Sequence, residues 1–173
     1  MRTSKQWWDE TKADPVKLIA WLKDQYHGEI TAAVRIGKLA FRFKNKTLKT
    51  IADQELQHAE WIDKLLSNRG IHGEILQKEE RYWERTLPFI DLNESRLEEI
   101  AAVGAHAEKM RLERIEVIAM DEAAPWDIRE TFLKIWPEEI FHAEAFTEMT
   151  TDECLEVALE NHNEGMNALG LIA

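Results

Sequence analysis

The chain has 173 residues, of which 45% are hydrophobic and 32% charged, the composition of one soluble globular domain with a sizeable core. Its net charge of −11 argues against nucleic acid or an anionic membrane surface as a partner, because both need clustered positive charge. A single cysteine, Cys154, excludes an internal disulfide and a Cys-x-x-Cys metal site. No apolar run is long enough for a transmembrane span or a signal-peptide core, so we expect a cytoplasmic protein.

The first half of the chain predicts two long helices joined by a short turn. Asp14-Pro15 is typical of a helix N-cap followed by proline in the first turn, and a 3.6-residue apolar period then continues to Phe43. The basic sequence 44–46 predicts the turn, and Thr47 is the expected cap of a second helix that ends at 68–70. The two helices are therefore expected to form a hairpin.

The second half predicts a long connection over 71–92, with a short helix at 78–85, and then a second hairpin. Its helices are expected from about 93–95 to 120 and from about 127 to 149, and Pro137 predicts a kink or a late start in the latter.

A capping box at Thr150-x-x-Glu153 predicts a fifth helix to about His162. Short link, long link and short link describe an all-α four-helix bundle with one long crossover and a short C-terminal fifth helix. We expect a single domain over residues 1–173, with the bundle core at about 15–150.

The spacing Glu-x25-Glu-x2-His occurs twice in the chain, and the second copy lies 84 residues after the first. Its polar residues interrupt helix faces that are otherwise apolar, where an uncompensated carboxylate is costly. The two copies consist of Glu29, Glu55 and His58, and of Glu113, Glu139 and His142.

Glutamate and histidine three positions apart share one helix face, so each Glu-x-x-His pair is able to bind one ion. Four carboxylates balance two divalent cations, and two imidazoles complete a mixed oxygen and nitrogen set that suits iron or manganese. One Glu-x-x-His alone is usually a surface hydrogen-bonding pair, but four glutamates in a core without metal would be strongly destabilised. The duplicated pattern therefore predicts a site for two metal ions.

Other residues near the predicted site leave alternatives open. Glu116, one turn after the glutamate of the third bundle helix, is a further ligand, a base beside the ligands or part of a surface salt bridge. Three aromatic residues lie one turn from predicted ligands: Tyr26, Trp61 and Trp136. They either carry electrons, line a substrate pocket or pack in the core. The Trp7-Trp8 pair is a candidate subunit contact.

The layout over residues 15–150 resembles the ferritin-like di-iron carboxylate superfamily, which includes ferritins, bacterioferritins and rubrerythrins. The resemblance implies that the six residues of the two copies bind two irons, with Glu55 and Glu139 as the bridging ligands. Glu113-x-x-Glu116 is similar to the extra glutamate of rubrerythrins, which suits a peroxide-reducing site. His-Gly-Glu29 with Arg35-Ile36 looks instead like the start of demethoxyubiquinone hydroxylases, as does the sequence around Glu55 and His58, and this implies a quinone substrate.

Three functions compete. The first is a di-iron oxidoreductase that reacts with dioxygen or hydrogen peroxide; one cysteine excludes a rubredoxin domain, so its electrons come from an external donor. The second is a ferritin-type ferroxidase that handles iron, and it predicts a closed assembly retaining more than two irons per chain. The third is a metal-free interaction domain, which requires the six residues to be dispersed or exposed. A homodimer is expected because hairpin bundles often pair.

Overall fold

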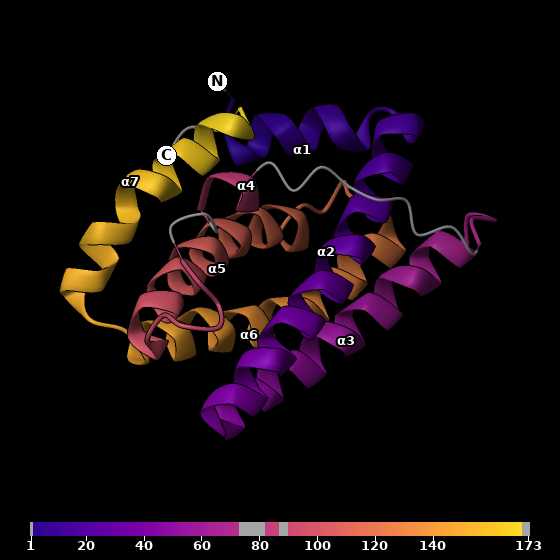
Figure 1. Ribbon diagram of the computed structural model, residues 1–173. Coiled ribbons are helices and arrows are strands. Elements are labelled where there is room, and N and C mark those ends of the chain that lie inside the picture. Colours follow the sequence, from indigo (N-terminus) through magenta and orange to yellow (C-terminus); the bar gives the residue numbers. More distant parts are fainter. Residues whose placement is uncertain (1, 73–81, 87–89, 171–173) are drawn as a thin grey trace. The chain divides into compact units, whose positions relative to one another are not determined.

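The computed structural model describes residues 2–72, 82–86 and 90–170, and within these ranges all regular secondary structure is helical (Figure 1). This confirms the all-α prediction. Within the same ranges, no helix combines the length and apolar character needed to cross a membrane. The helices are α1 (Ser4–Lys12), α2 (Pro15–Phe43), α3 (Lys46–Ser67), α4 (Trp83–Thr86), α5 (Leu97–Ala119), α6 (Trp126–Glu148) and α7 (Asp152–Ala168).

The chain divides into two compact units, each built from separate stretches of sequence. The α2–α3 unit contains Trp8–Lys78 and Ile118–Ile135, and the α5–α7 unit contains Met1–Trp7, Glu79–Val117 and Trp136–Ala173. The boundaries fall within α1, α5 and α6. A single domain over the whole chain stays a prediction.

In the α2–α3 unit, α2 and α3 pack along each other as an antiparallel hairpin (Figure 1). Asp14 caps α2 as predicted, since its carboxylate accepts from the N–H of Val16 at 2.9 Å. The helix ends where Lys44 adopts a left-handed conformation with φ of 48°. The prediction that Thr47 caps α3 is wrong: Asn45 does so, accepting from Leu48 N–H at 3.1 Å, and a two-residue link therefore joins the helices.

Aromatic rings anchor the core of this unit. Trp21 lies with its ring centroid 5.3 Å from Trp8 and 5.4 Å from Phe132. Trp8 is only 1% exposed and donates its indole N–H to Asp121 at 2.8 Å, so it belongs to the core and not to a subunit contact. The large aliphatic residues buried to within 2% exposure here are Leu22, Leu48, Ile51, Ile62, Ile118, Ile128 and Ile135.

The helices of the α5–α7 unit differ from the predictions mainly at their ends. α5 starts at Leu97, slightly later than expected, and α6 continues through Pro137 without a late start. Thr151, not Thr150, caps α7 by accepting from Cys154 N–H at 3.2 Å. The fifth helix also extends past the predicted end at His162 to Ala168.

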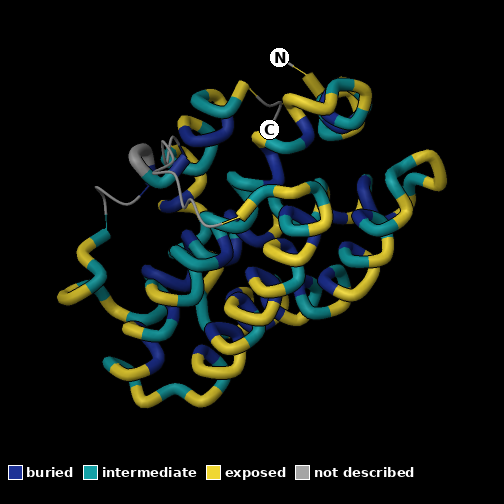
Figure 2. The backbone as a smooth tube through the Cα atoms, turned by 90° about the vertical axis from the view of Figure 1, so that its right-hand side faces the viewer, coloured by how far each residue is buried: buried dark blue, intermediate teal, exposed yellow. Residues whose placement is uncertain are grey.

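Around the start of α7, this unit has its own small apolar core, in which Ala102, Val103 and Ala158 are buried. α4 packs against α7. Of the helix predicted at 78–85, residues 78–81 lie outside the described residues, and α4 (Trp83–Thr86) overlaps the rest. Figure 2 shows buried and exposed positions alternating along the helices, the pattern of amphipathic elements that each cover a core with one face.

Candidate metal centre

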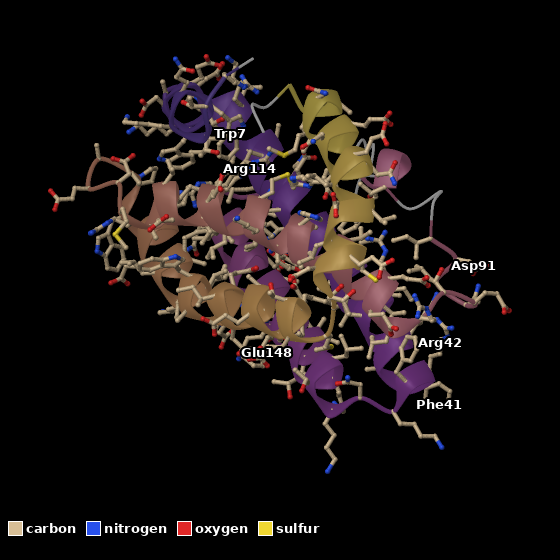
Figure 3. The ribbon with its side chains drawn as sticks, turned by 90° about the vertical axis from the view of Figure 1, so that its left-hand side faces the viewer. Trp7, Phe41, Arg42, Asp91, Arg114 and Glu148 are labelled. Carbon is tan, nitrogen blue, oxygen red and sulfur yellow. The ribbon has the colours of Figure 1, made fainter. Side chains whose placement is uncertain are left out.

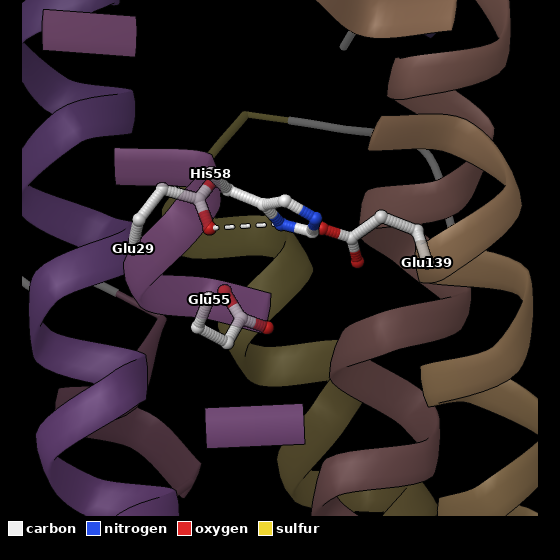
Figure 4. A group of neighbouring side chains, drawn as sticks. All are labelled: Glu29, Glu55, His58 and Glu139. Atoms are coloured by element: carbon white, nitrogen blue, oxygen red, sulfur yellow. Dashed lines mark ion pairs between the residues drawn. The ribbon is translucent and has the colours of Figure 1, made fainter. Parts of the chain in front are cut away.

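The α2–α3 unit brings together three of the predicted ligands, which we call the first triad: Glu29 from α2, and Glu55 and His58 from α3. Their side chains are 1%, 0% and 0% exposed, and one ligand atom from each lies within 4.8 Å of the others. Nδ1 of His58 is 3.7 Å from Oε2 of Glu29, the ion pair drawn as a dashed line in Figure 4. The sequence prediction for these three positions agrees with their placement.

Local helix periodicity explains why these polar side chains are buried. Leu22, Glu29 and Ile36 follow at seven-residue intervals on α2, and all three are buried. On α3, Glu55 and His58 lie three positions apart between the buried residues Ile51 and Ile62. Apolar neighbours on the same stripe therefore carry the triad into the interior.

The α5–α7 unit holds a second triad, formed by Glu108 from α5 with Glu139 and His142 from α6. Their side chains are 7%, 0% and 0% exposed, and their ligand atoms also converge to within 4.8 Å. Nδ1 of His142 is 3.6 Å from Oε2 of Glu139. A guanidinium nitrogen of Arg111, one turn after Glu108, lies 3.1 Å from Oε1 of Glu139.

Two predicted residues on α5 do not join this triad. Glu113 and Glu116 are both exposed, so the structure does not bring Glu113 together with Glu139 and His142. Glu108 takes the place that the sequence analysis gave to Glu113. The exposed position of Glu116 also removes the argument for a rubrerythrin-type extra ligand.

The difference on α5 is one of helix phase, meaning which face of the helix is buried. On α5 the residues Ala101, Ala105, Glu108 and Ile115 form a buried stripe of mostly small or apolar side chains. The opposite stripe is exposed, and its spacing of three and four residues is equally regular. It consists of Lys109, Glu113, Glu116 and Met120.

The 84-residue repeat therefore holds for the two Glu-x-x-His pairs but not for the glutamates that accompany them. Residues 44–45 link the helices of the first hairpin, whereas residues 120–125 link those of the second. A longer link moves the facing residue on α5 further from α6 in sequence, which is why Glu108 and not Glu113 meets Glu139.

The aromatic residues singled out near the ligands are placed as follows. Tyr26 is half-buried on α2, and Trp136 is half-buried on α6. The ring of Trp61 lies 5.7 Å from that of His58 in a tilted arrangement. Trp61 thus packs on a triad imidazole, and a role for Tyr26 stays a prediction.

Positive charge in the α5–α7 unit extends beyond Arg111. Burial, together with repulsion from Arg2 and Arg111, lowers the pKa of Arg114 to about 10. Its guanidinium lies 5.6 Å from the ring of Trp7, and Figure 3 labels both residues. Arg111 was missed by the sequence analysis, although its position three residues after Glu108 places it on the same face.

The donor set fits bound metal. Each triad offers two carboxylates and one imidazole from side chains at most 7% exposed, and such groups are costly to bury unless they are paired or coordinate cations. An all-α chain with buried triads of this composition has the features of helical metal-carboxylate proteins.

The model of the Rubrerythrin family matches residues 21–150, and the chain belongs to this family. Rubrerythrins are part of the ferritin-like di-iron superfamily, which confirms both the predicted resemblance and the predicted fold class. No curated protein and no solved structure matches the chain.

Proposed function

We propose that this protein is an oxidoreductase with two metal ions, held by Glu29, Glu55 and His58 and by Glu108, Glu139 and His142. The observation that carries the proposal is the pair of buried triads, each with two carboxylates and one imidazole. Membership of the Rubrerythrin family supports the same reading. Dioxygen or hydrogen peroxide is the electron acceptor, and an external donor supplies the electrons.

A mixed set of carboxylates and imidazoles suits both iron and manganese. We propose iron as the metal and manganese as the alternative. Iron in such a site supplies the reducing electrons for dioxygen or peroxide. The remaining contributions come from the chain: the carboxylates balance the cationic charge, and the helix faces around them exclude water. Arg111 stabilises the negative charge of Glu139 whether or not metal is present.

The two alternative functions are affected differently. A metal-free interaction domain required dispersed or exposed residues, and the burial of both triads argues against it. Ferritin-type iron handling uses the same ligands and differs in outcome, since it requires retention of more than two irons per chain. Exposed Glu116 no longer favours peroxide over dioxygen.

An anaerobic titration of the metal-free protein with ferrous iron tests the proposal. We expect saturation at two irons per chain, followed by an absorption band of oxidised iron on addition of air or peroxide. Saturation at one weak site, or no binding, would contradict the metal centre. Retention of many irons per chain would favour iron handling.

Two alanine variants of α5 form a matched pair for the ligand assignment. Glu108→Ala removes a buried carboxylate of the second triad and is expected to reduce iron content below two per chain. Glu113→Ala removes an exposed carboxylate from the same helix and is expected to leave iron content unchanged. The reverse result would restore the original sequence assignment.

A cytoplasmic location and a homodimer remain part of the proposal. Light scattering tests the homodimer.

A further inference from the structure

A buried tyrosine and a histidine form a hydrogen-bonded pair in the α5–α7 unit. Tyr82, which precedes α4, is 5% exposed, and its hydroxyl lies 2.7 Å from Nδ1 of His162 on α7. Neither residue belongs to the triads. A phenol held this close to an imidazole has a defined acceptor for its proton.

The surroundings fix the geometry of this pair. Gly165 on α7 leaves room for the phenol ring, since a Cβ there would lie 2.5 Å from the ring of Tyr82. On its other side His162 stacks on His106 of α5, with ring centroids 4.9 Å apart and an interplanar angle of 20°. His106 in turn donates its Nε2–H to the carbonyl of Leu155 at 2.9 Å. Three separate segments therefore hold the pair in place.

From this geometry we propose that Tyr82 is a redox-active residue that loses one electron while its proton moves to His162. The O–H bond of Tyr82 breaks, an N–H bond forms at Nδ1 of His162, and the electron passes to a one-electron oxidant. The product is a neutral tyrosyl radical hydrogen-bonded to an imidazolium. Reduction by an external donor returns the electron, and the proton moves back to the phenol oxygen.

The charge states at neutral pH suit this step. Burial, with smaller effects from His106 and Lys109, lowers the pKa of His162 to about 4, so its Nδ1 lone pair is available. Burial and the charge of Glu108 raise the pKa of Tyr82, so the phenol keeps its proton until it is oxidised. An oxidised phenol is a strong acid, and even a weakly basic imidazole accepts its proton.

The charge of Glu108 also links the pair to the second triad, since Glu108 is one of the triad carboxylates. A metal ion held by the second triad would be the oxidant of Tyr82, and this part of the inference rests on the proposed function. The hydrogen-bonded pair itself does not depend on bound metal.

The chain has two tyrosines, which makes assignment of a radical direct. Metal-free protein containing ring-deuterated tyrosine is oxidised with a photogenerated ruthenium(III) complex, and the radical is recorded by electron paramagnetic resonance. We expect a tyrosyl signal in the wild type and in Tyr26→Phe, and its loss in Tyr82→Phe. Persistence of the signal in Tyr82→Phe would overturn the proposal.

Removal of the proton acceptor is the second measurement. In His162→Ala the rate of Tyr82 oxidation is expected to fall by about 10²-fold, the usual effect of a positioned base, and added imidazole should restore it. A structural role alone would not give rescue by imidazole. An unchanged rate in a variant with native circular dichroism would overturn the role of His162.

Metal-loaded protein treated with peroxide separates this inference from the proposed function. The same radical in loaded protein would support the metal centre as oxidant. A radical that forms in metal-free protein but not in metal-loaded protein would exclude the metal centre as the oxidant. It would still support the redox role of Tyr82 and His162. If no Tyr82 radical forms in metal-free protein that still binds two irons per chain when titrated, the redox role of Tyr82 is overturned. The proposed function is then unaffected.

Discussion

The two triads share one donor set but differ in the groups that surround it. In the first triad, the imidazole of His58 is the ion-pair partner of Glu29. In the second, the guanidinium of Arg111 lies 3.1 Å from Glu139, in addition to the imidazole of His142 at 3.6 Å. A histidine is charged only when protonated, whereas an arginine carries its charge throughout the neutral pH range. Without metal, the carboxylate of Glu29 is therefore paired with an imidazole, whereas that of Glu139 is paired with a guanidinium as well.

This difference has a consequence for metal binding. In the second triad, a cation must compete with a permanent positive charge beside Glu139, whereas in the first it replaces at most a proton. We expect the first triad to bind its ion more tightly than the second. The following predictions test this comparison, in order of decreasing effect.

Loss of a ligand from the first triad should have the largest effect. Glu55→Ala removes a carboxylate that is 0% exposed, and we expect iron content to fall from two ions per chain to one or none. The metal-free form should remain folded, because a buried negative charge has been removed. Metal analysis together with thermal melting checks both points, and a variant that retained two irons would exclude Glu55 as a ligand.

Truncation of the core beside the first triad should reduce stability without changing ligand chemistry. Leu22 is 0% exposed, seven residues before Glu29 on α2, and Leu22→Ala is expected to lower the free energy of unfolding by about 2–5 kcal/mol. Val16→Ala, at a position 77% exposed on the same helix, is the control and should change it little. Equal effects in urea denaturation would contradict the assigned face of α2.

Removal of the permanent charge from the second triad should make it more like the first. In Arg111→Met the metal-free protein is expected to lose about 1–3 kcal/mol of stability, because buried Glu139 loses a charged partner. Affinity for the second ion should rise, so that metal raises the melting temperature more than in the wild type. Arg42→Met, on α2 beside the ring of Phe43, is the control. Unchanged iron affinity in Arg111→Met would contradict the claim that the charge of Arg111 weakens metal binding at the second triad.

The Arg69–Asp127 ion pair should make the smallest contribution to stability, and that contribution should depend on pH. Hydrogen bonds from Arg69 at 2.7 and 3.0 Å hold the pKa of Asp127 below its ordinary value of 3.8, although burial opposes this. Because the folded-state pKa is lowered, the stabilisation is present above about pH 4 and is lost as pH falls through that lowered value.

Asp127→Asn is therefore expected to cost about 0.2–1 kcal/mol at pH 7 and less at acid pH. Urea denaturation across pH 2–7 measures the difference. The exposed pair Lys49–Asp53 serves as reference through Asp53→Asn, which should cost less. A cost for Asp127→Asn that was constant from pH 7 to pH 2 would contradict the ion pair.

Periodicity predicted α2 and α3 well because both helices have strong apolar stripes, although the cap was predicted correctly only for α2. The same reasoning failed on α5, where small and apolar residues cover much of the surface and leave several phases plausible; Glu108 was missed for this reason. α1 was also missed, although Thr3 and Gln6 form a reciprocal capping box at 3.0 and 3.2 Å. The contact of Arg111 with Glu139 depends on helix packing, which spacing alone does not give.

Pro137 gives α6 a mechanical property that α3 lacks. Proline has no N–H, so the carbonyl four residues earlier, that of Leu133, loses its helical hydrogen bond nearly two turns before Glu139 of the second triad. Leu133 is itself 38% exposed. The turn immediately before Glu139 therefore has one backbone hydrogen bond fewer than an uninterrupted helix. We therefore expect the second triad to adjust more readily to ions of different radius than the first, whose Glu55 and His58 lie on α3, a helix without proline.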